Sequence, residues 1–172
     1  MRQIIGLMGK AGCGKSTAAS VLAGYGYQRM RFAQPLKAML RTLGLTVEQT
    51  DGDQKEIPCS LLGGKTPRWA MQTLGTEWGR DLIDQDLWVR AAMKVVRDKG
   101  GFFVFDDVRF DNEATAIWDA GGSIWRIGRE QTIVTAANHI SEQAVADLLP
   151  DLYLANNGTI ADLQERINEH ML

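Results

Sequence analysis

The spacing of apolar residues along the chain predicts strands and helices in alternation. Short apolar runs predict buried strands at residues 3–8, 27–33, 102–105, 123–128 and 151–155. Helical periodicity and capping signals predict helices at residues 15–24, 35–43, 66–81, 87–99, 111–120, 141–149 and from Thr159 onward. Such alternation is typical of a parallel sheet with helices on both faces. We therefore expect an α/β fold: a three-layer αβα arrangement around a mostly parallel five-stranded sheet.

Two stretches of the chain depart from these periodic patterns. Residues 44–66 contain Asp51-Gly52-Asp53 and Gly63-Gly64, combinations that predict turns and irregular structure. Residues 129–140 form a polar stretch after a predicted strand. We interpret this stretch, taken to about residue 141, as a lid that would close over a bound ligand and exclude water.

The length and composition of the chain are those of one globular domain over residues 1–172. A formal net charge of −2 argues against a general nucleic-acid binder. The two cysteines, Cys13 and Cys59, are too few for a disulfide framework, and no apolar run is long enough to span a bilayer. We therefore expect a soluble cytoplasmic protein with neither nucleic-acid nor membrane partners.

The strongest chemical signal is a glycine-rich loop between the first predicted strand and the first predicted helix. Its sequence, Gly-Lys-Ala-Gly-Cys-Gly-Lys-Ser, matches the phosphate-binding pattern G-x-x-x-x-G-K-[ST]. Glycines let successive backbone N–H groups wrap around phosphate oxygens, and the helix N-terminus adds positive potential. Lys15 would contact the outer phosphates, and the Ser16 hydroxyl would hold Mg²⁺. We assign ATP binding to Gly9, Lys10, Ala11, Gly12, Cys13, Gly14, Lys15, Ser16 and Thr17.

A second chemical signal is the pair Asp106-Asp107, which ends the predicted strand at 102–105. Carboxylates at the C-terminal ends of parallel strands lie where open α/β sheets bind ligands. We expect Asp107 to hold Mg²⁺ opposite Ser16, with Asp106 as the alternative. Without a ligand, the pair would be a solvated strand end or a cap for the next helix.

Phosphoryl transfer also needs cations, because the charge of the migrating group spreads over three oxygens. Arg109 stands two residues after Asp107, at the ligand-binding end of the predicted sheet. Arg68 shares a helical stripe with Gln72 and Thr76, whose polar groups suit contacts with a base or a sugar. The full set of candidate cations is Lys37, Arg68, Arg109, Arg126 and Arg129.

Short motifs follow one another along most of the chain. They are Phe32-Ala33-Gln34-Pro35-Leu36-Lys37, the stretch from Arg68 to Thr76, Asp86-Leu87-Trp88-Val89, Asp107-Val108-Arg109 with Asp111 and Glu113, His139-Ile140-Ser141-Glu142, and Asn156-Asn157-Gly158-Thr159. Together with the glycine-rich loop, these motifs resemble those of the phage-type deoxynucleoside monophosphate kinases, in the P-loop nucleoside monophosphate kinase superfamily.

This resemblance implies Mg²⁺-dependent transfer of the γ-phosphate of ATP to a deoxynucleoside 5′-monophosphate. It implies a kinase core of residues 1–34 and 100–172, a helical acceptor-binding region of about residues 35–99, and a homodimer by family analogy. The catalytic positions it implies are Lys15, Asp107, Arg109 and Arg129. It further implies acceptor binding by Lys37, Arg68, Gln72, Thr76, Trp88 and Arg109, and a turn near the donor adenine at Asn157 and Gly158.

Two other functions remain open at this point. A kinase of another phosphorylated metabolite, such as dephospho-coenzyme A or phosphomevalonate, would share the loop but differ around Arg68, Gln72 and Trp88. A nucleotide-dependent switch or ATPase module would capture a protein partner, although no guanine-reading motif favours it. The segment between Lys37 and Arg68 is shorter than in longer members of the family, so the resemblance leaves the preferred base open.

Overall fold

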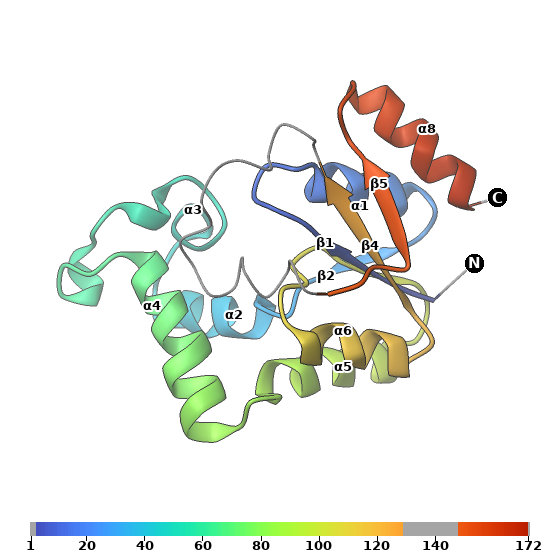
Figure 1. Cartoon of the computed structure of the whole chain (residues 1–172). Coiled ribbons are helices and arrows are strands. Elements are labelled where there is room, and N and C mark those ends of the chain that lie inside the picture. The colour runs from blue at the N-terminus through green and yellow to red at the C-terminus, as the bar shows by residue number, and fades with distance from the viewer. Residues whose placement is uncertain (1–2, 129–147, 172) are drawn as a thin grey trace. The chain divides into compact units, whose positions relative to one another are not determined.

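The computed structural model describes residues 3–128 and 148–171. Within them, five strands form one sheet in the order β2-β3-β1-β4-β5, and every neighbouring pair is parallel (Figure 1). The strands are β1 (Ile4–Met8), β2 (Gln28–Met30), β3 (Phe103–Phe105), β4 (Ser123–Gly128) and β5 (Leu152–Ala155). This confirms the expected α/β fold with a five-stranded parallel sheet.

Most helices follow the predicted periodicity, but the short helix α3 (Val47–Thr50) forms within residues 44–66, where irregular structure was expected, because Thr46 and Gln49 cap it reciprocally. The described helices are α1 (Lys15–Gly24), α2 (Gln34–Thr42), α3, α4 (Pro67–Thr73), a π-helix (Leu74–Ile83), α5 (Leu87–Lys99), α6 (Asp111–Asp119) and α8 (Ile160–Met171), with single 3₁₀ turns at Gln54–Glu56 and Ser60–Leu62. The helix expected over residues 66–81 changes to π geometry half-way. The helix expected over 141–149 lies outside the described residues up to 147, and residues 148–150 are not helical. No described helix is both long and apolar enough to cross a membrane.

The described chain forms two compact units. One combines Met1–Arg31 with Val95–Leu172, and the other is Phe32–Lys94. The first unit contains the whole sheet, the glycine-rich loop and the C-terminal helix. The second is helical throughout its regular elements.

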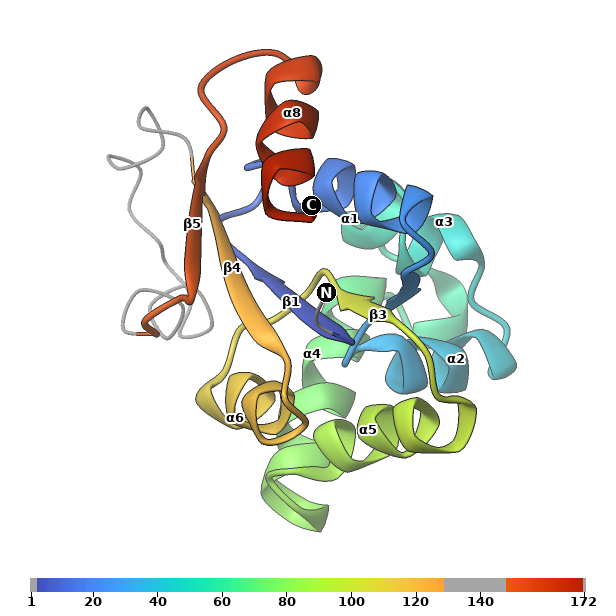
Figure 2. The same ribbon diagram turned by 90° about the vertical axis from the view of Figure 1, so that its right-hand side faces the viewer.

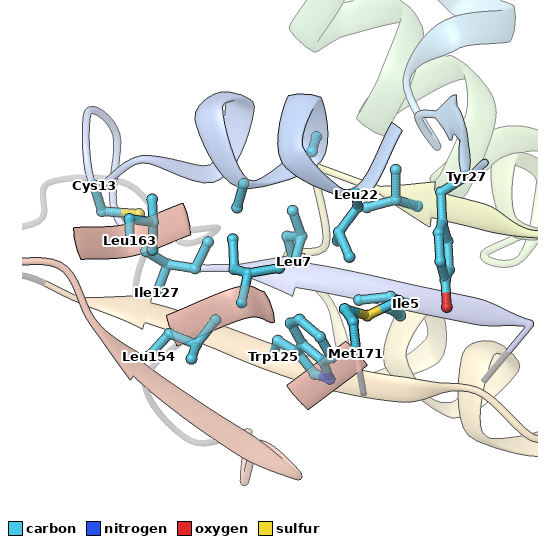
Figure 3. Packing of buried hydrophobic residues seen from close by; sticks show 14 residues of the cluster. Ile5, Leu7, Cys13, Leu22, Tyr27, Trp125, Ile127, Leu154, Leu163 and Met171 are labelled. Atoms are coloured by element: carbon cyan, nitrogen blue, oxygen red, sulfur yellow. The ribbon is translucent and has the colours of Figure 1, made fainter. Parts of the chain in front are cut away.

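In the first unit, helices cover both faces of the sheet. Side chains of α1 and α8, among them Leu22 and Ile167, pack with the strand residues Leu7, Ile127 and Leu154 in one apolar cluster (Figure 3). On the other face α6 lies against β1 and β4, and Figure 2 shows α6 on the side of the sheet opposite α1 and α8. Three layers result, as the alternating pattern predicts.

The helix α8 begins as its capping pattern predicts. Thr159 N donates to Asp162 Oδ2 at 2.6 Å, and Asp162 N donates to Thr159 Oγ1 at 3.3 Å. The hydrogen bond from the Thr159 backbone lowers the pKa of the Asp162 carboxyl. This reciprocal arrangement satisfies amide groups that have no partner within the helix.

The second unit has its own small apolar cluster. It buries Leu40 of α2, Ala70 of α4, and Leu45, which lies between α2 and α3. Leu62, Met71 and Leu74 pack against these three residues. The helix α4 begins where Thr66 Oγ1 accepts from Trp69 N at 3.1 Å, and Pro67 occupies its first position. Proline is well placed there because its missing N–H would have no partner within the helix.

Candidate active site

The glycine-rich loop joins β1 to α1, and its backbone takes conformations that favour glycine. Gly9 has a φ of 141° and Gly14 a φ of 109°, values that side chains strongly disfavour. Side chains at these positions would also clash with their neighbours. A Cβ at Gly9 would lie 2.3 Å from Ile127 O, and one at Gly14 would lie 2.4 Å from Asn156 Nδ2. Glycine therefore lets the loop pass close to the carboxyl ends of β4 and β5.

Lys15 places its ammonium group inside this loop. Nζ donates to Gly9 O at 2.6 Å and to Lys10 O at 2.8 Å, and it lies 3.8 Å from Cys13 Sγ. Burial lowers the pKa of Lys15, and the charge of Arg109 lowers it further, while Cys13 acts in the opposite direction. The loop thus surrounds a cation at the position where loops of this kind bind phosphate oxygens.

Asn156 supports the loop from the end of β5, a contact that the motifs above do not assign. Its side chain is buried, and Nδ2 donates to Cys13 O at 2.8 Å. Its own backbone N donates to Gly128 O at 2.7 Å. Asn157 and Gly158, the predicted neighbours of the donor adenine, lie exposed in the turn before α8. A polar residue directly after an apolar strand is the signal that points to Asn156.

Two arginines of β2 and its end converge on Asp106, and neither was among the candidate cations. Arg29 Nε donates to Asp106 Oδ2 at 2.7 Å, and Arg31 Nε donates to Asp106 Oδ1 at 2.8 Å. Arg29 Nη2 contacts the same Oδ2 and also donates to Ser16 Oγ at 3.0 Å. A sequence signal for this pair exists: Arg29 and Arg31 are two positions apart, and alternate residues of a strand point to the same face.

The Asp106 carboxylate is buried and remains ionised because of these arginines. Burial alone raises the pKa of Asp106, but hydrogen bonds from Arg31 and Arg29 outweigh burial and bring the pKa below its ordinary value. The carboxylate connected to Ser16 through a shared guanidinium is therefore that of Asp106. The metal-binding role expected for Asp107 stays a prediction, and the geometry favours its neighbour.

Arg109 is held at the carboxyl end of β3 through its backbone. Its N donates to Glu113 Oε2 at 2.7 Å, and Phe110 N donates to the same oxygen at 3.2 Å. Glu113 is buried at the start of α6, where a carboxylate suits the helix N-terminus. The Arg109 side chain is exposed, and its charge acts on Lys15. The catalytic and acceptor-binding roles of Arg109 stay predictions.

Several predicted residues lie outside the described part of the chain. Arg129, His139 and the predicted lid at about 129–141 belong to this group, and their roles stay predictions. Arg126, another candidate cation, is described, and its Nη2 donates to Leu148 O. This bond ties Arg126 to the segment that precedes β5.

In the second unit, the candidate acceptor-binding cations each contact a carboxylate. Lys37 Nζ lies 2.6 Å from Asp51 Oδ1. Arg41, which was not a candidate, contacts the same carboxylate, with Nη2 2.7 Å from Asp51 Oδ2. Arg68 Nε pairs with Glu56 at an exposed position. Gln72 and Thr76 are exposed as well, on α4 and the π-helix. The acceptor-binding roles of Lys37, Arg68, Gln72 and Thr76 stay predictions.

Trp88, expected in the acceptor pocket, has a buried ring. Its side chain is only 3% exposed, and Nε1 donates to Gly75 O at 2.8 Å. The ring covers Gly79, where an added Cβ would lie 2.6 Å from it, and packs at an angle against Trp78. A direct contact of Trp88 with a base is therefore not supported by this geometry. The physical reason is that Gly79 leaves a space that the indole fills, while Gly75 O accepts the indole N–H.

Comparison with known proteins identifies the family. A family model described as deoxynucleotide monophosphate kinase matches residues 65–167, more than half of the chain. This chain belongs to the deoxynucleotide monophosphate kinase family. A relative from Acanthamoeba polyphaga mimivirus, assigned by its name to the same kinases, is 36% identical over 183 residues. The match covers 95% of this chain and 93% of the relative, so the likeness extends well beyond the region of the family model.

Solved structures show which fold this kinase shares. Shikimate kinase from Aquifex aeolicus vf5 superposes with a TM-score of 0.53 at 11% identity, covering 98% of this chain and 95% of its own. A dephospho-CoA kinase from Campylobacter jejuni superposes with a TM-score of 0.50 at 14% identity, covering 99% and 96%. At these identities the likeness concerns the fold, which is the expected α/β kinase architecture.

Proposed function

We propose that this kinase transfers the γ-phosphate of ATP to a deoxynucleoside 5′-monophosphate and so produces the diphosphate for DNA synthesis. The observation that carries the proposal is the phosphate-binding loop with Lys15 at its centre, in a chain of the deoxynucleotide monophosphate kinase family. The loop supplies the donor site, and the family supplies the class of acceptor.

The first unit would bind the donor. Backbone amides of the loop and of the first turn of α1 point to the phosphates, and Lys15 exchanges its bonds with Gly9 O and Lys10 O for bonds with phosphate oxygens. This exchange also relieves the cost of burying the ammonium group, because an anion then replaces neutral carbonyls. Asn156 keeps the loop in shape by its bond with Cys13 O.

The residues that fit a magnesium ion are Ser16 and Asp106. A hydroxyl and a carboxylate are hard oxygen ligands of the kind that Mg²⁺ prefers, and one guanidinium nitrogen contacts both. Among the described residues, no group of three His, Cys, Asp or Glu side chains could hold a metal ion without help. Such a site relies on phosphate oxygens of the nucleotide, as in other phosphoryl-transfer enzymes. When bound, Mg²⁺ neutralises charge on the β- and γ-phosphates.

Phosphoryl transfer itself would depend on position and charge. Lys15 and Arg109 supply cations beside the loop, and no residue needs to form a covalent intermediate. Arg129, in the predicted lid, would add another. The reaction is thus a direct displacement in which the acceptor phosphate attacks the γ-phosphorus and ADP leaves.

The acceptor would bind through the second unit. Lys37 and Arg68 are ordered by Asp51 and Glu56, and a phosphate competes with these carboxylates for the same nitrogens. Gln72 and Thr76 would present polar groups to a base or sugar. Trp88 would stabilise the π-helix through its hydrogen bond to Gly75 O. The proposed site of action is the cytoplasm, where these nucleotides are found.

A panel of acceptors tests the proposal. ATP and Mg²⁺ are incubated with each common deoxy- and ribonucleoside monophosphate, and diphosphates are separated by chromatography, with Lys15→Ala as the control. We expect diphosphate from at least one deoxynucleotide and none from the control. Phosphorylation of dephospho-coenzyme A instead, or ATP binding without any acceptor turnover, would contradict the proposal.

A further inference from the structure

Arg29 occupies a position that the proposed reaction does not explain. Its Nη2 contacts both Ser16 Oγ and Asp106 Oδ2, the two oxygens that fit a magnesium ion. Its Nε donates to the same carboxylate oxygen at 2.7 Å. One guanidinium of a strand residue thus links the start of α1 with the end of β3. The side chain is partly exposed at 36%, so it has room to leave this position.

Two arginines pair with the Asp106 carboxylate, Arg29 and Arg31. Of these two, Arg29 also donates to Ser16 Oγ, in the first turn of the helix α1 that would receive phosphates. A cation at this position favours an anion in the adjoining loop. The same cation opposes a second cation that seeks the same two oxygens.

We propose that Arg29 acts as an internal counter-cation of the metal site, exchanged for Mg²⁺ when a metal-nucleotide binds. In the nucleotide-free protein the guanidinium holds Ser16 and Asp106. With Mg²⁺ bound there, Arg29 would release Ser16 and Asp106 and turn its exposed guanidinium toward solvent. With metal-free nucleotide, Arg29 keeps its place and itself supplies the positive charge beside the phosphates. This inference rests on the proposed function, because it requires a nucleotide in the loop.

The proposal predicts a specific change in the metal dependence of nucleotide binding. Dissociation constants for ADP are measured by calorimetry in Mg²⁺ and in EDTA. Arg29→Gln removes the charge, so binding of metal-free ADP should weaken by about tenfold or more, while binding of Mg²⁺-ADP should change by less than about threefold or become tighter. The ratio of the two constants, EDTA over Mg²⁺, should therefore rise by about tenfold.

Arg31→Gln is the matched control. It removes a second guanidinium from the same carboxylate, where Nε donates to Oδ1 and Nη2 to Oδ2, and it leaves the contact between Arg29 and Ser16. Its ratio should stay within about threefold of wild type. An equal rise in both variants would show that total charge on Asp106 matters and not the shared contact, and it would overturn the proposal. Equal weakening in both buffers for Arg29→Gln would overturn it as well.

A second variant at Arg29 keeps the test valid if Arg29→Gln fails to fold. Arg29→Lys retains the charge and loses the planar fork, so its ratio should lie between those of wild type and Arg29→Gln. Circular dichroism identifies which variants are folded, and an unchanged ratio in the folded ones contradicts the inference. If wild-type protein phosphorylates an acceptor and the Arg29 variants have the wild-type ratio, only the inference is refuted. Wild-type protein that binds no adenine nucleotide in either buffer refutes the proposed function too.

Discussion

At the scale of single residues, the polar groups of the donor site are satisfied by one another. The Lys15 ammonium bonds carbonyls of its own loop, and Asp106 is bonded by two guanidinium groups. Buried polar groups require such partners, because desolvation without a hydrogen bond is costly. Ligand binding at this site must therefore exchange existing bonds for new ones.

The first prediction at this scale concerns Asp106→Asn. Two guanidinium groups lose their anionic partner, and because both are partly exposed we expect a loss of about 2 kcal/mol in the free energy of unfolding at pH 7. The folded pKa of Asp106 lies below its ordinary value of 3.8. Its contribution is thus present above pH 4 and lost as the pH falls through the folded pKa. Urea unfolding between pH 7 and pH 3 measures this. A difference between variant and wild type that stays constant with pH contradicts the prediction.

The second prediction compares two glycines of the loop. Gly14→Ala puts a methyl group 2.4 Å from Asn156 Nδ2 at a φ of 109°, whereas Gly12→Ala meets nothing within 4 Å at a φ of 75°. Both variants suffer backbone strain of about 1 kcal/mol or more. Only Gly14→Ala also displaces Asn156, so we expect it to lower the unfolding temperature more and to abolish ATP binding. Differential scanning fluorimetry and calorimetry measure both effects, and equal behaviour of the two variants would refute the steric account.

At the scale of elements, the π-helix Leu74–Ile83 is built around its glycines. Gly75 O accepts from Trp88 Nε1 at 2.8 Å and from Arg80 Nη1 at 3.1 Å. Gly75 and Gly79 are buried, and the missing side chain of Gly79 lets the indole approach the backbone. π-Helical turns are frequent at functional sites, and this one continues the helix that carries Gln72. Its shape depends on a contact with α5 that no local pattern encodes.

The third prediction concerns this contact. Gly79→Ala would place a methyl group 2.6 Å from the buried Trp88 ring, so we expect a loss of about 1–3 kcal/mol in the free energy of unfolding. Trp88→Phe removes the bond to Gly75 O and should cost about 1 kcal/mol from the hydrogen bond, with a further loss from the smaller ring. Glu77→Ala, at an exposed position of the same helix, is the control. Chemical denaturation measures all three, and a neutral Gly79→Ala would show that the ring moves aside without cost.

At the scale of the whole molecule, stability should respond to the nucleotide. A ligand that binds only the folded state at one hundred times its dissociation constant stabilises the protein by about 2.7 kcal/mol. For a chain of this size, that corresponds to a rise of roughly 5–11 °C in the unfolding temperature. We expect this rise with Mg²⁺-ATP for wild type and its loss in Lys15→Ala. Thermal scans measure it, and a full shift in the variant would remove Lys15 from the donor site.

Local patterns account for much of this fold. The ends of α1 and α5 coincide with the predicted helices at residues 15–24 and 87–99, because apolar periodicity and flanking glycines act within one element. The loop from Gly9 to Ser16 is likewise recognisable from neighbouring residues alone. Local patterns left the outcome open where packing between elements decides, as at Trp88, whose position at a helix start suits exposure and burial equally well.

The sequence by itself therefore determined the alternation of strands and helices, the glycine-rich loop and the capping of α8, since each depends on residues a few positions apart. Only the tertiary structure revealed that Arg29 joins Ser16 to Asp106, because Arg29 and Asp106 are 77 residues apart in the chain. They meet because β2 pairs with β3 in the order β2-β3-β1, which brings their carboxyl ends to one edge of the sheet. The support of the loop by Asn156, 143 residues from Cys13, has the same origin in strand order.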